Sequence, residues 1–262
     1  MNPRAPVLFV SHGAPTVALE DDAYTHALAA FGGTTRPRAV VVVSAHWEDR
    51  GPVRVNDALR SELIYDFSGF PRSLYAIEYR APGAPDVAEK TLGLLTAAGI
   101  DAVAESSRGW DHGVWVPLRI LYPGAAVPIV QISLPVPRTP ESVFRLGEAL
   151  GPLRDEGVML VGSGGVVHNL RRLRWDDAEG PPEGWAHDFD AWVAERLERR
   201  AFGEVLGYRD AAPHADQAVP TTEHFDPIFF ALGAASPEDR AATVYAGFTY
   251  GTVSMRTFAL AS

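Results

Sequence analysis

The stretch PVLFVSHGAPT, residues 6–16, decides how the chain begins to fold. The four apolar residues Val7 to Val10 run into a Ser-His-Gly sequence, and a short apolar run that stops at a glycine is typical of a buried strand. His12 therefore stands at the tip of a strand. A polar residue at such a tip has one of two explanations. Either it simply faces water at the end of the strand, or it belongs to a functional site. Whether other strands end in the same way decides between the two.

Further apolar runs predict more strands, and helical patterns lie between them. The predicted strands cover residues 6–11, 39–45, 53–55, 101–105, 127–133, 158–163, 243–248 and 252–260, and the predicted helices cover 22–31, 85–98, 140–151 and 185–200. Continuous apolar strands that alternate with helices favour the α/β class, with a central, mostly parallel (mixed) sheet covered by helices. No long linker divides the chain, so we expect a single catalytic domain, residues 1–262, with a loop at 207–221 that can border a pocket.

The composition excludes several classes of protein. The 23 Lys and Arg against 33 Asp and Glu give a net charge of −10, which disfavours binding to nucleic acid. No segment has the length of apolar sequence that a membrane span or a signal peptide needs, so we expect a cytoplasmic protein. The absence of cysteine excludes disulfides and thiolate metal sites. Any metal ion must then be held by His, Asp or Glu.

Three of the eight histidines follow strong apolar strands. His12 follows VLFVS, His46 follows VVVVSA, and His168 follows VMLVGSGGVV. Ligands of open α/β sheets bind beyond the carboxyl ends of the strands, and in a parallel sheet these ends lie side by side. We therefore expect the three imidazoles to converge. His112 in GWDHGVW and His224 in TTEHFDP lie in short turns, where functional groups are common.

The other histidines have simpler explanations. His26 and His187 lie in helical patterns and are expected to be surface or packing residues. His214 is expected in a solvated loop, with lining of the site as the alternative. Each of the first five, taken alone, would also be explained as a polar residue at the water boundary. The repetition of the pattern at separate strand ends favours a shared site.

Imidazole ligands without cysteine point to a metal ion, either Zn(II) or non-haem Fe(II). HExxH, GxSxG and Walker A motifs are all missing from the sequence, which argues against a helix-borne metalloprotease, a serine hydrolase and a P-loop enzyme. The GSGG sequence at 162–165 lacks the spacing of a dinucleotide-binding loop. Its glycines are expected to let the backbone turn and to aim His168.

Seven motifs together resemble one known family. They are SHGAPT, SAHW, YDFSGFPRSLYAIEYRAPG, DHGVWVPL, GSGGVVHNL, TEHFDP and GTVSMRTF, and they run in order from residue 10 to residue 258. The sequence resembles the class III extradiol ring-cleaving dioxygenases, in particular the 4,5-DOPA dioxygenase type. The resemblance implies that family's fold and an oxidoreductase that opens a catecholic ring, of DOPA or a related catechol, with O2 at a non-haem metal.

The resemblance also implies roles for individual residues. His12, His46 and His224 match metal ligands, and His168 matches either a further ligand or the acid/base beside the metal. His112 matches a substrate-side histidine, so the proton transfers that the reaction needs fall to His112 or His168. The implied cofactor is one divalent ion, Fe(II) for turnover or Zn(II) as bound.

One departure from the wider class concerns the third ligand. Relatives that act on protocatechuate use a glutamate there, whereas this chain has Glu223 and His224 side by side. Neighbouring residues on an extended segment face opposite sides, so only one of the two can reach the metal, and the branch pattern favours His224.

Two other functions stay open at this point. A zinc hydrolase can use the same histidines, and a binding protein without catalysis can share the fold, although five retained histidines argue against the latter. Asp111 is expected to orient His112 or to cap the following turn. The candidate aromatic walls are Trp47, Tyr65, Phe67, Phe70 and Trp115, although core packing is the favoured explanation for most of them. The candidate partners for a substrate carboxylate are Arg72, Arg108 and Arg171. The sequence does not indicate an oligomeric state.

Overall fold

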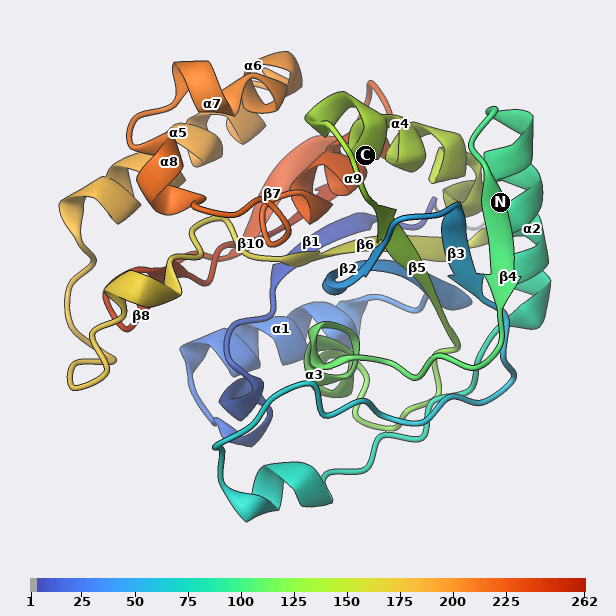
Figure 1. The fold of residues 1–262 in the computed structure, drawn as a ribbon, viewed down its shortest axis with the longest axis horizontal. Coiled ribbons are helices and arrows are strands. Elements are labelled where there is room, and N and C mark those ends of the chain that lie inside the picture. The colour runs from blue at the N-terminus through green and yellow to red at the C-terminus, as the bar shows by residue number, and fades with distance from the viewer. Residues whose placement is uncertain (1–3) are drawn as a thin grey trace.

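A mixed sheet forms the centre of the computed structural model, which describes residues 4–262. Within those residues the sheet has eight strands in the order β4-β3-β5-β2-β6-β1-β10-β7 (Figure 1). Their bounds are β1 Val7–Ser11, β2 Ala39–Asp49, β3 Val53–Asn56, β4 Ala102–Glu105, β5 Ile129–Pro135, β6 Val158–Gly164, β7 Arg240–Tyr245 and β10 Thr257–Ala261. A separate two-stranded ribbon joins β8 (Phe248–Thr249) to β9 (Val253–Ser254).

The four central strands β5, β2, β6 and β1 are parallel, and antiparallel pairs join them to β3 on one side and to β10 and β7 on the other. This confirms the predicted mostly parallel, mixed sheet. The run Val40 to Val43 in β2 explains why these strands are central, because every side chain in it is at most 1% exposed. Only a strand covered on both faces buries such a continuous run.

Helices cover both faces of the sheet. Figure 1 shows α1 and α3 on one side and α4 and α9 on the other. The helices are α1 Ala23–Thr34, α2 Pro85–Ala97, α3 His112–Leu121, α4 Pro140–Leu150, α5 Gly184–Glu198, α6 Phe202–Leu206, α7 Tyr208–Ala211, α8 Ala215–Ala218 and α9 Pro227–Gly233, with short 3-10 turns at Pro15–Leu19 (η1), Arg72–Ala76 (η2), Gly151–Glu156 (η3) and Leu170–Arg172 (η4).

The core is divided by the sheet into two clusters. Alternate residues of β1 enter different clusters: Val7 and Phe9 pack with α2, α4, α5 and α9, whereas Leu8 and Val10 pack with α1 and α3. This is the alternation expected of a strand with both faces buried.

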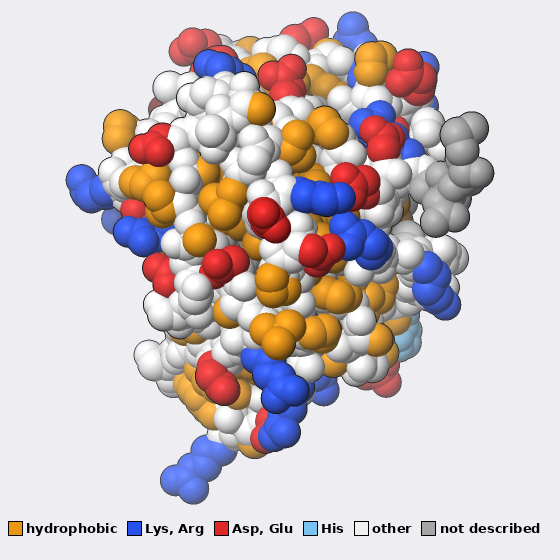
Figure 2. All heavy atoms as spheres, turned by 90° about the vertical axis from the view of Figure 1, so that its right-hand side faces the viewer, with side chains coloured by type: hydrophobic (Ala, Val, Ile, Leu, Met, Phe, Trp, Pro, Cys, Tyr) orange, Lys and Arg blue, Asp and Glu red, His pale blue; other side chains and the backbone are white. Residues whose placement is uncertain are grey.

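No helix in the described part of the chain combines the length and apolar character that a bilayer crossing requires. On the face beside α2 and β4, acidic and basic side chains are interspersed (Figure 2).

The structure adds helices that the sequence pattern did not predict. Eight of the ten residues of α3 and all seven of α9 are buried, so neither helix has the polar face that makes helical periodicity visible. His112 was expected in a turn but is the first residue of α3. The segment predicted as a loop at 207–221 contains the short helices α7 and α8, and the strand predicted at 252–260 is interrupted between β9 and β10.

Two glycines of β6 hold the turn before α9 against the sheet. A Cβ on Gly162 would lie 2.2 Å from the carbonyl oxygen of Pro227, and one on Gly164 would lie 2.0 Å from that of His224. The N–H of Gly165 donates to the same His224 carbonyl at 2.8 Å. The GSGG sequence was expected to aim His168, but two of its glycines instead make room for the segment from His224 to Pro227.

We expect Gly164→Ala to lower the free energy of unfolding by about 1–3 kcal/mol or more, because backbone atoms on both sides must move apart. Gly165→Ala is the matched control, since its added carbon would meet nothing closer than 3.9 Å and should change stability by less than about 0.5 kcal/mol. Urea denaturation of the two variants measures the difference. Equal stabilities would mean that the close approach to β6 is not needed.

Candidate active site

Five histidines from separate segments line one cavity of about 240 Å³ at the carboxyl ends of the central strands. They are His12 after β1, His46 in β2, His112 at the start of α3, His168 after β6 and His224 in the turn before α9. The structure therefore brings together all five histidines that the sequence singled out. His26, His187 and His214 lie apart from the cavity with largely exposed side chains, as expected.

His46 reaches the cavity because β2 is irregular there. Strand β2 runs to Asp49, beyond its predicted end at residue 45. Its pairing with β5 shifts register between Val43 and Glu48, and His46 lies within this shift. The backbone N–H of His46 donates to Ser44 Oγ at 3.2 Å within this irregular stretch. A bulge of this kind re-aims a side chain, and here it turns the imidazole toward β1.

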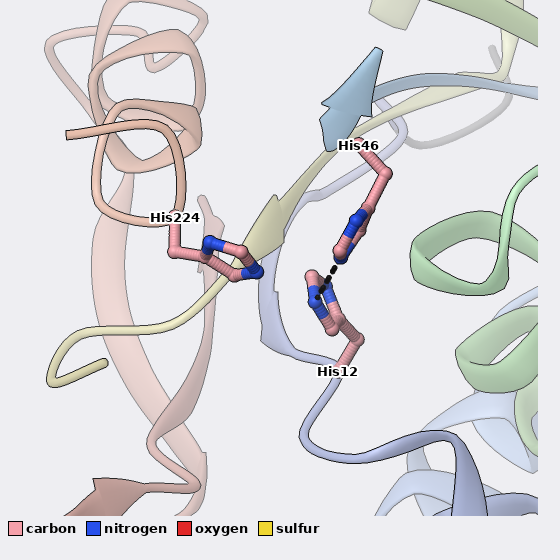
Figure 3. A group of neighbouring side chains, drawn as sticks. All are labelled: His12, His46 and His224. Carbon is pink, nitrogen blue, oxygen red and sulfur yellow. Dashed lines mark hydrogen bonds between the residues drawn. The ribbon is translucent and has the colours of Figure 1, made fainter. Parts of the chain in front are cut away.

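Three of the imidazoles form a group with the geometry of a metal site. One nitrogen each of His12, His46 and His224 lies within 4.8 Å of the other two, and the three rings point toward one another from three segments of the chain (Figure 3). The Nε2 atoms of His12 and His46 are 3.1 Å apart. Nitrogen ligands of one ion must converge in this way, so the group fits a divalent metal.

Hydrogen bonds on the outer side of the rings determine which nitrogen faces the centre. Ser163 donates its hydroxyl proton to the carbonyl of Gly113, so its oxygen accepts from His12 Nδ1 at 3.0 Å. Glu223 Oε1 accepts from His224 Nδ1 at 3.1 Å. Both rings therefore carry their proton on Nδ1 and turn the Nε2 lone pair inward, which is the arrangement that a metal ligand needs.

Burial keeps the imidazoles of His12 and His46 neutral. Burial, and next the neighbouring rings of His46 and His224, hold the pKa of His12 well below its ordinary value. Burial, with His112 as the next cause, lowers the pKa of His46 to about 2. A positive imidazole would lose its hydration and repel its neighbours, so the rings stay in the form that binds a metal ion.

The structure places His224, not Glu223, in the group with His12 and His46. Glu223 turns outward, where it accepts from His224 Nδ1 and from the Thr221 hydroxyl at 2.8 Å. Burial raises the pKa of Glu223, but these hydrogen bonds outweigh it and bring the pKa to about 2. Glu223 therefore places a negative charge next to Nδ1 of His224, on the side of the ring that faces away from His12 and His46.

His168 lies beside the group of three. Its ring stacks on that of His224 with 3.5 Å between the ring centroids, and its backbone N–H donates to the carbonyl of Ala218. It is within 4.8 Å of Glu223 and His224 but is not in the group of His12, His46 and His224. Burial, and next His224, lower the pKa of His168 to about 3, so its imidazole is neutral.

The sequence analysis assigned no role to Asp66, which is the partner of His112. Asp66 Oδ1 accepts from both Nδ1 and the backbone N–H of His112, at 2.9 and 3.1 Å, and its Oδ2 lies 3.4 Å from His46 Nδ1. Burial raises the pKa of Asp66, but the contacts with His112 and His46 outweigh it and lower the pKa to about 2. The carboxylate within the highly specific YDFSGFP motif was the signal available in the sequence.

Asp111 neither orients His112 nor caps the helix with its side chain, contrary to both expectations. It is fully buried and accepts from Ser44 at 2.7 Å, from Gln131 and from Arg108 at 3.3 Å. Asp111 therefore ties the end of β2 to the start of α3 and fixes the backbone that carries His46 and His112.

Of the five predicted aromatic walls, Phe67 and Phe70 line the cavity and the other three do not. Trp115 and Tyr65 bond to the backbone carbonyls of Ile64 and Ile77 away from the cavity. The other large apolar side chains of the lining were not predicted and are Leu170, Leu173, Trp175 and Val253, with Tyr250 beside them. A larger cavity of about 700 Å³ lies between residues 60 and 82, but no histidine lines it.

Comparisons with known proteins agree with this site. Residues 6–257 match the family described as the catalytic LigB subunit of aromatic ring-opening dioxygenase. A protein of Beta vulgaris named 4,5-DOPA dioxygenase extradiol is 36% identical, over 97% of this chain and 96% of that one. A protein of Escherichia coli K12 with the same name is 38% identical, over 96% of this chain and 93% of that one.

A solved structure extends the likeness to the fold. The crystal structure of an uncharacterized protein from Escherichia coli K12 matches with a TM-score of 0.82 and 35% identity, over 98% of this chain and 99% of that one. The chain therefore belongs to the LigB family of class III extradiol enzymes and is an aromatic ring-opening dioxygenase.

Proposed function

We propose that this enzyme opens a catechol ring with O2 at a single Fe(II) ion held by Nε2 of His12, His46 and His224. The observation that carries the proposal is the convergence of nitrogen atoms from these three rings. In His12 and His224, the hydrogen bonds from Nδ1 to Ser163 and Glu223 leave the lone pair of Nε2 facing the centre of the group. When bound, the ion supplies Lewis acidity and a path for electrons between the ring and oxygen. Zn(II) has no redox chemistry, and for that reason we assign the working metal as iron.

His112 is the proposed base. Its Nδ1–H donates to Asp66, so the lone pair on Nε2 is available to accept a proton from a catechol hydroxyl. The Asp66 carboxylate then stabilises the imidazolium that forms, in the manner of the carboxylate in other His-dependent enzymes. His168 lines the same cavity as a neutral imidazole, so it accepts a proton before it can donate one.

The cavity supports a small aromatic substrate. Its volume of about 240 Å³ is slightly below the range for drug-sized ligands, about 300–1,000 Å³, which suits a small ring, and Phe67 and Phe70 supply faces for that ring. The net charge of −10 supports a small molecule rather than nucleic acid as the partner, and we expect the enzyme in the cytoplasm. The curated relatives are named for 4,5-DOPA, which makes a substituted catechol the class of substrate to test.

Anaerobic loading of metal-stripped protein with Fe(II), followed by air and a catechol, tests the proposal. We expect oxygen uptake matched to the formation of a yellow ring-opened product. The same protein loaded with Zn(II) is the control and should consume no oxygen. No uptake with any catechol at full iron occupancy would contradict the proposal, and ester and amide substrates would then test for hydrolysis.

Substitutions separate the ligands from the proton-transfer residues. We expect His12→Ala, His46→Ala and His224→Ala each to lose bound iron, because two imidazoles leave the ion under-coordinated. His112→Ala should retain iron and lose turnover. His26→Ala and His187→Ala, both on exposed side chains, are the controls and should change neither. Metal analysis measures the bound iron and oxygen uptake measures turnover. Near-stoichiometric iron in one of the His12, His46 or His224 variants would show that this residue is not a ligand.

Asp66→Asn tests the role of the carboxylate beside His112. The amide oxygen of asparagine can accept the same two hydrogen bonds but carries no negative charge to stabilise the His112 imidazolium, so we expect kcat to fall by about 10–100-fold with KM and iron content little changed. Asp21→Asn removes a similar Asp–His contact, with His26 on the surface, and should leave kcat unchanged. An unaltered kcat in Asp66→Asn would show that the charge of this carboxylate does not assist the base.

A further inference from the structure

The cavity that holds the histidines has no charged side chain to recognise a charged substituent. Beyond the histidines, its lining is mainly apolar, with Phe67, Phe70, Leu170, Leu173, Trp175 and Val253 as the large side chains. Throughout residues 4–262, no Lys, Arg, Asp or Glu side chain lines it, and its only hydroxyls are those of Thr249 and Tyr250. A catechol bound here would have its two oxygens at the histidines and its substituent among apolar groups.

Two arginines on segments that flank the cavity, Arg108 and Arg256, are already paired. Arg108 donates to Asp111 and to the carbonyl of His46, and its guanidinium lies over Trp47. Arg256 donates to both oxygens of Asp190 through Nε, and its Nη2 donates to Oδ2 of the same carboxylate. A guanidinium held in this way does not turn toward a ligand without breaking a charge-assisted pair.

Arg174 lies between the lining residues Leu173 and Trp175, yet its side chain is also directed away. It forms ion pairs with Asp177 and Glu183 and donates to the carbonyl of Pro181. Arg72 and Arg171, which the sequence suggested as partners for a carboxylate, are exposed and do not line the cavity. The third suggested residue, Arg108, is the one paired with Asp111.

The next cavity along the surface is acidic. It has a volume of about 350 Å³, is lined by Glu20, Asp22 and Glu179, and shares Ala14, Thr249 and Tyr250 with the histidine cavity. A carboxylate on the substrate would therefore lose its hydration among apolar groups and also approach negative charge. Both effects oppose its binding.

Two large apolar side chains stand at the rim. Leu170 is 57% exposed and Trp175 is 66% exposed, and both line the histidine cavity. Apolar surface left in water next to a ligand cavity is well suited to cover an apolar group of the ligand.

We propose that this site selects catechols whose substituent is neutral and apolar, an alkyl or aryl group, over catechols that carry a carboxylate. The inference rests on the proposed catechol dioxygenase activity and specifies its substrate class. Phe67 and Phe70 hold the ring, and the rim of Leu170 and Trp175 covers the substituent.

Four catechols with side chains of similar length test this. They are 4-propylcatechol (neutral), dopamine (cationic), 3-(3,4-dihydroxyphenyl)propionate (anionic) and L-DOPA (zwitterionic). With iron-loaded protein and oxygen uptake as the readout, we expect kcat/KM for 4-propylcatechol to exceed that for the propionate and for L-DOPA by at least about tenfold, mainly through KM. Equal or better turnover of either carboxylate would overturn the proposal. A preference for dopamine would also overturn it and would assign recognition of the side chain to Glu20, Asp22 and Glu179.

Anaerobic titration calorimetry of the same four compounds separates this inference from the proposed activity. If none of them is turned over but the Kd values follow the expected order, the activity fails and the preference for an apolar substituent stands. If all four are turned over with equal Kd and equal kcat/KM, the activity stands and the preference is wrong.

Three substitutions sharpen the test. Leu170→Arg should raise kcat/KM for the propionate and lower it for 4-propylcatechol, since it places a cation at the rim. Leu59→Arg adds the same charge at an exposed leucine that lines neither of these cavities and should leave both values unchanged. Arg171→Ala should not alter the ratio between the two substrates, and a selective loss with the propionate would show that Arg171 does recognise carboxylates.

Discussion

Because Gly162 and Gly164 have no Cβ atom, the segment from His224 to Pro227 can lie directly against strand β6. Since β6 runs between β1 and β2, this contact delivers His224 to the place where those two strands deliver His12 and His46. Ser163 lies between the two glycines and faces the opposite side of the sheet, where it bonds to His12 and to the start of α3. Three consecutive residues thus determine the position of one proposed ligand and the orientation of another.

The charges of the site are arranged in two layers. The inner layer consists of imidazoles, and burial together with repulsion by neighbouring rings lowers the pKa of three of them, His12, His46 and His168, so that these three are neutral. The outer layer holds the carboxylates of Asp66 and Glu223, which remain ionised because each accepts hydrogen bonds from a histidine. A divalent cation entering such a site meets uncharged ligands first and is balanced by negative charge behind them.

Local sequence patterns predicted the central strands and the histidines at their ends, since a buried strand and the residue at its tip are close in sequence. Sequence periodicity did not predict the helices α3 and α9, because nearly every residue in them is buried and no amphipathic pattern remains. Long-range packing decided the rest. Asp66 meets His112 only because the loop that carries it folds over the strand ends, and the role of Arg108 became clear only from its pairing with Asp111.

The first strand pairs with the last. β1 lies between β6 and β10, the backbone N–H of Ser11 donates to the hydroxyl of Thr257, and that of His12 donates to the carbonyl of Gly164. Contacts so distant in sequence form late in folding, because a long loop must close before they contribute any stability. A chain still emerging from the ribosome therefore cannot hold His12 in its native setting before residues 257–261 have been made. A metal ion bound at these strand ends joins a finished sheet, and its binding free energy stabilises the cooperative fold as a whole rather than any single segment.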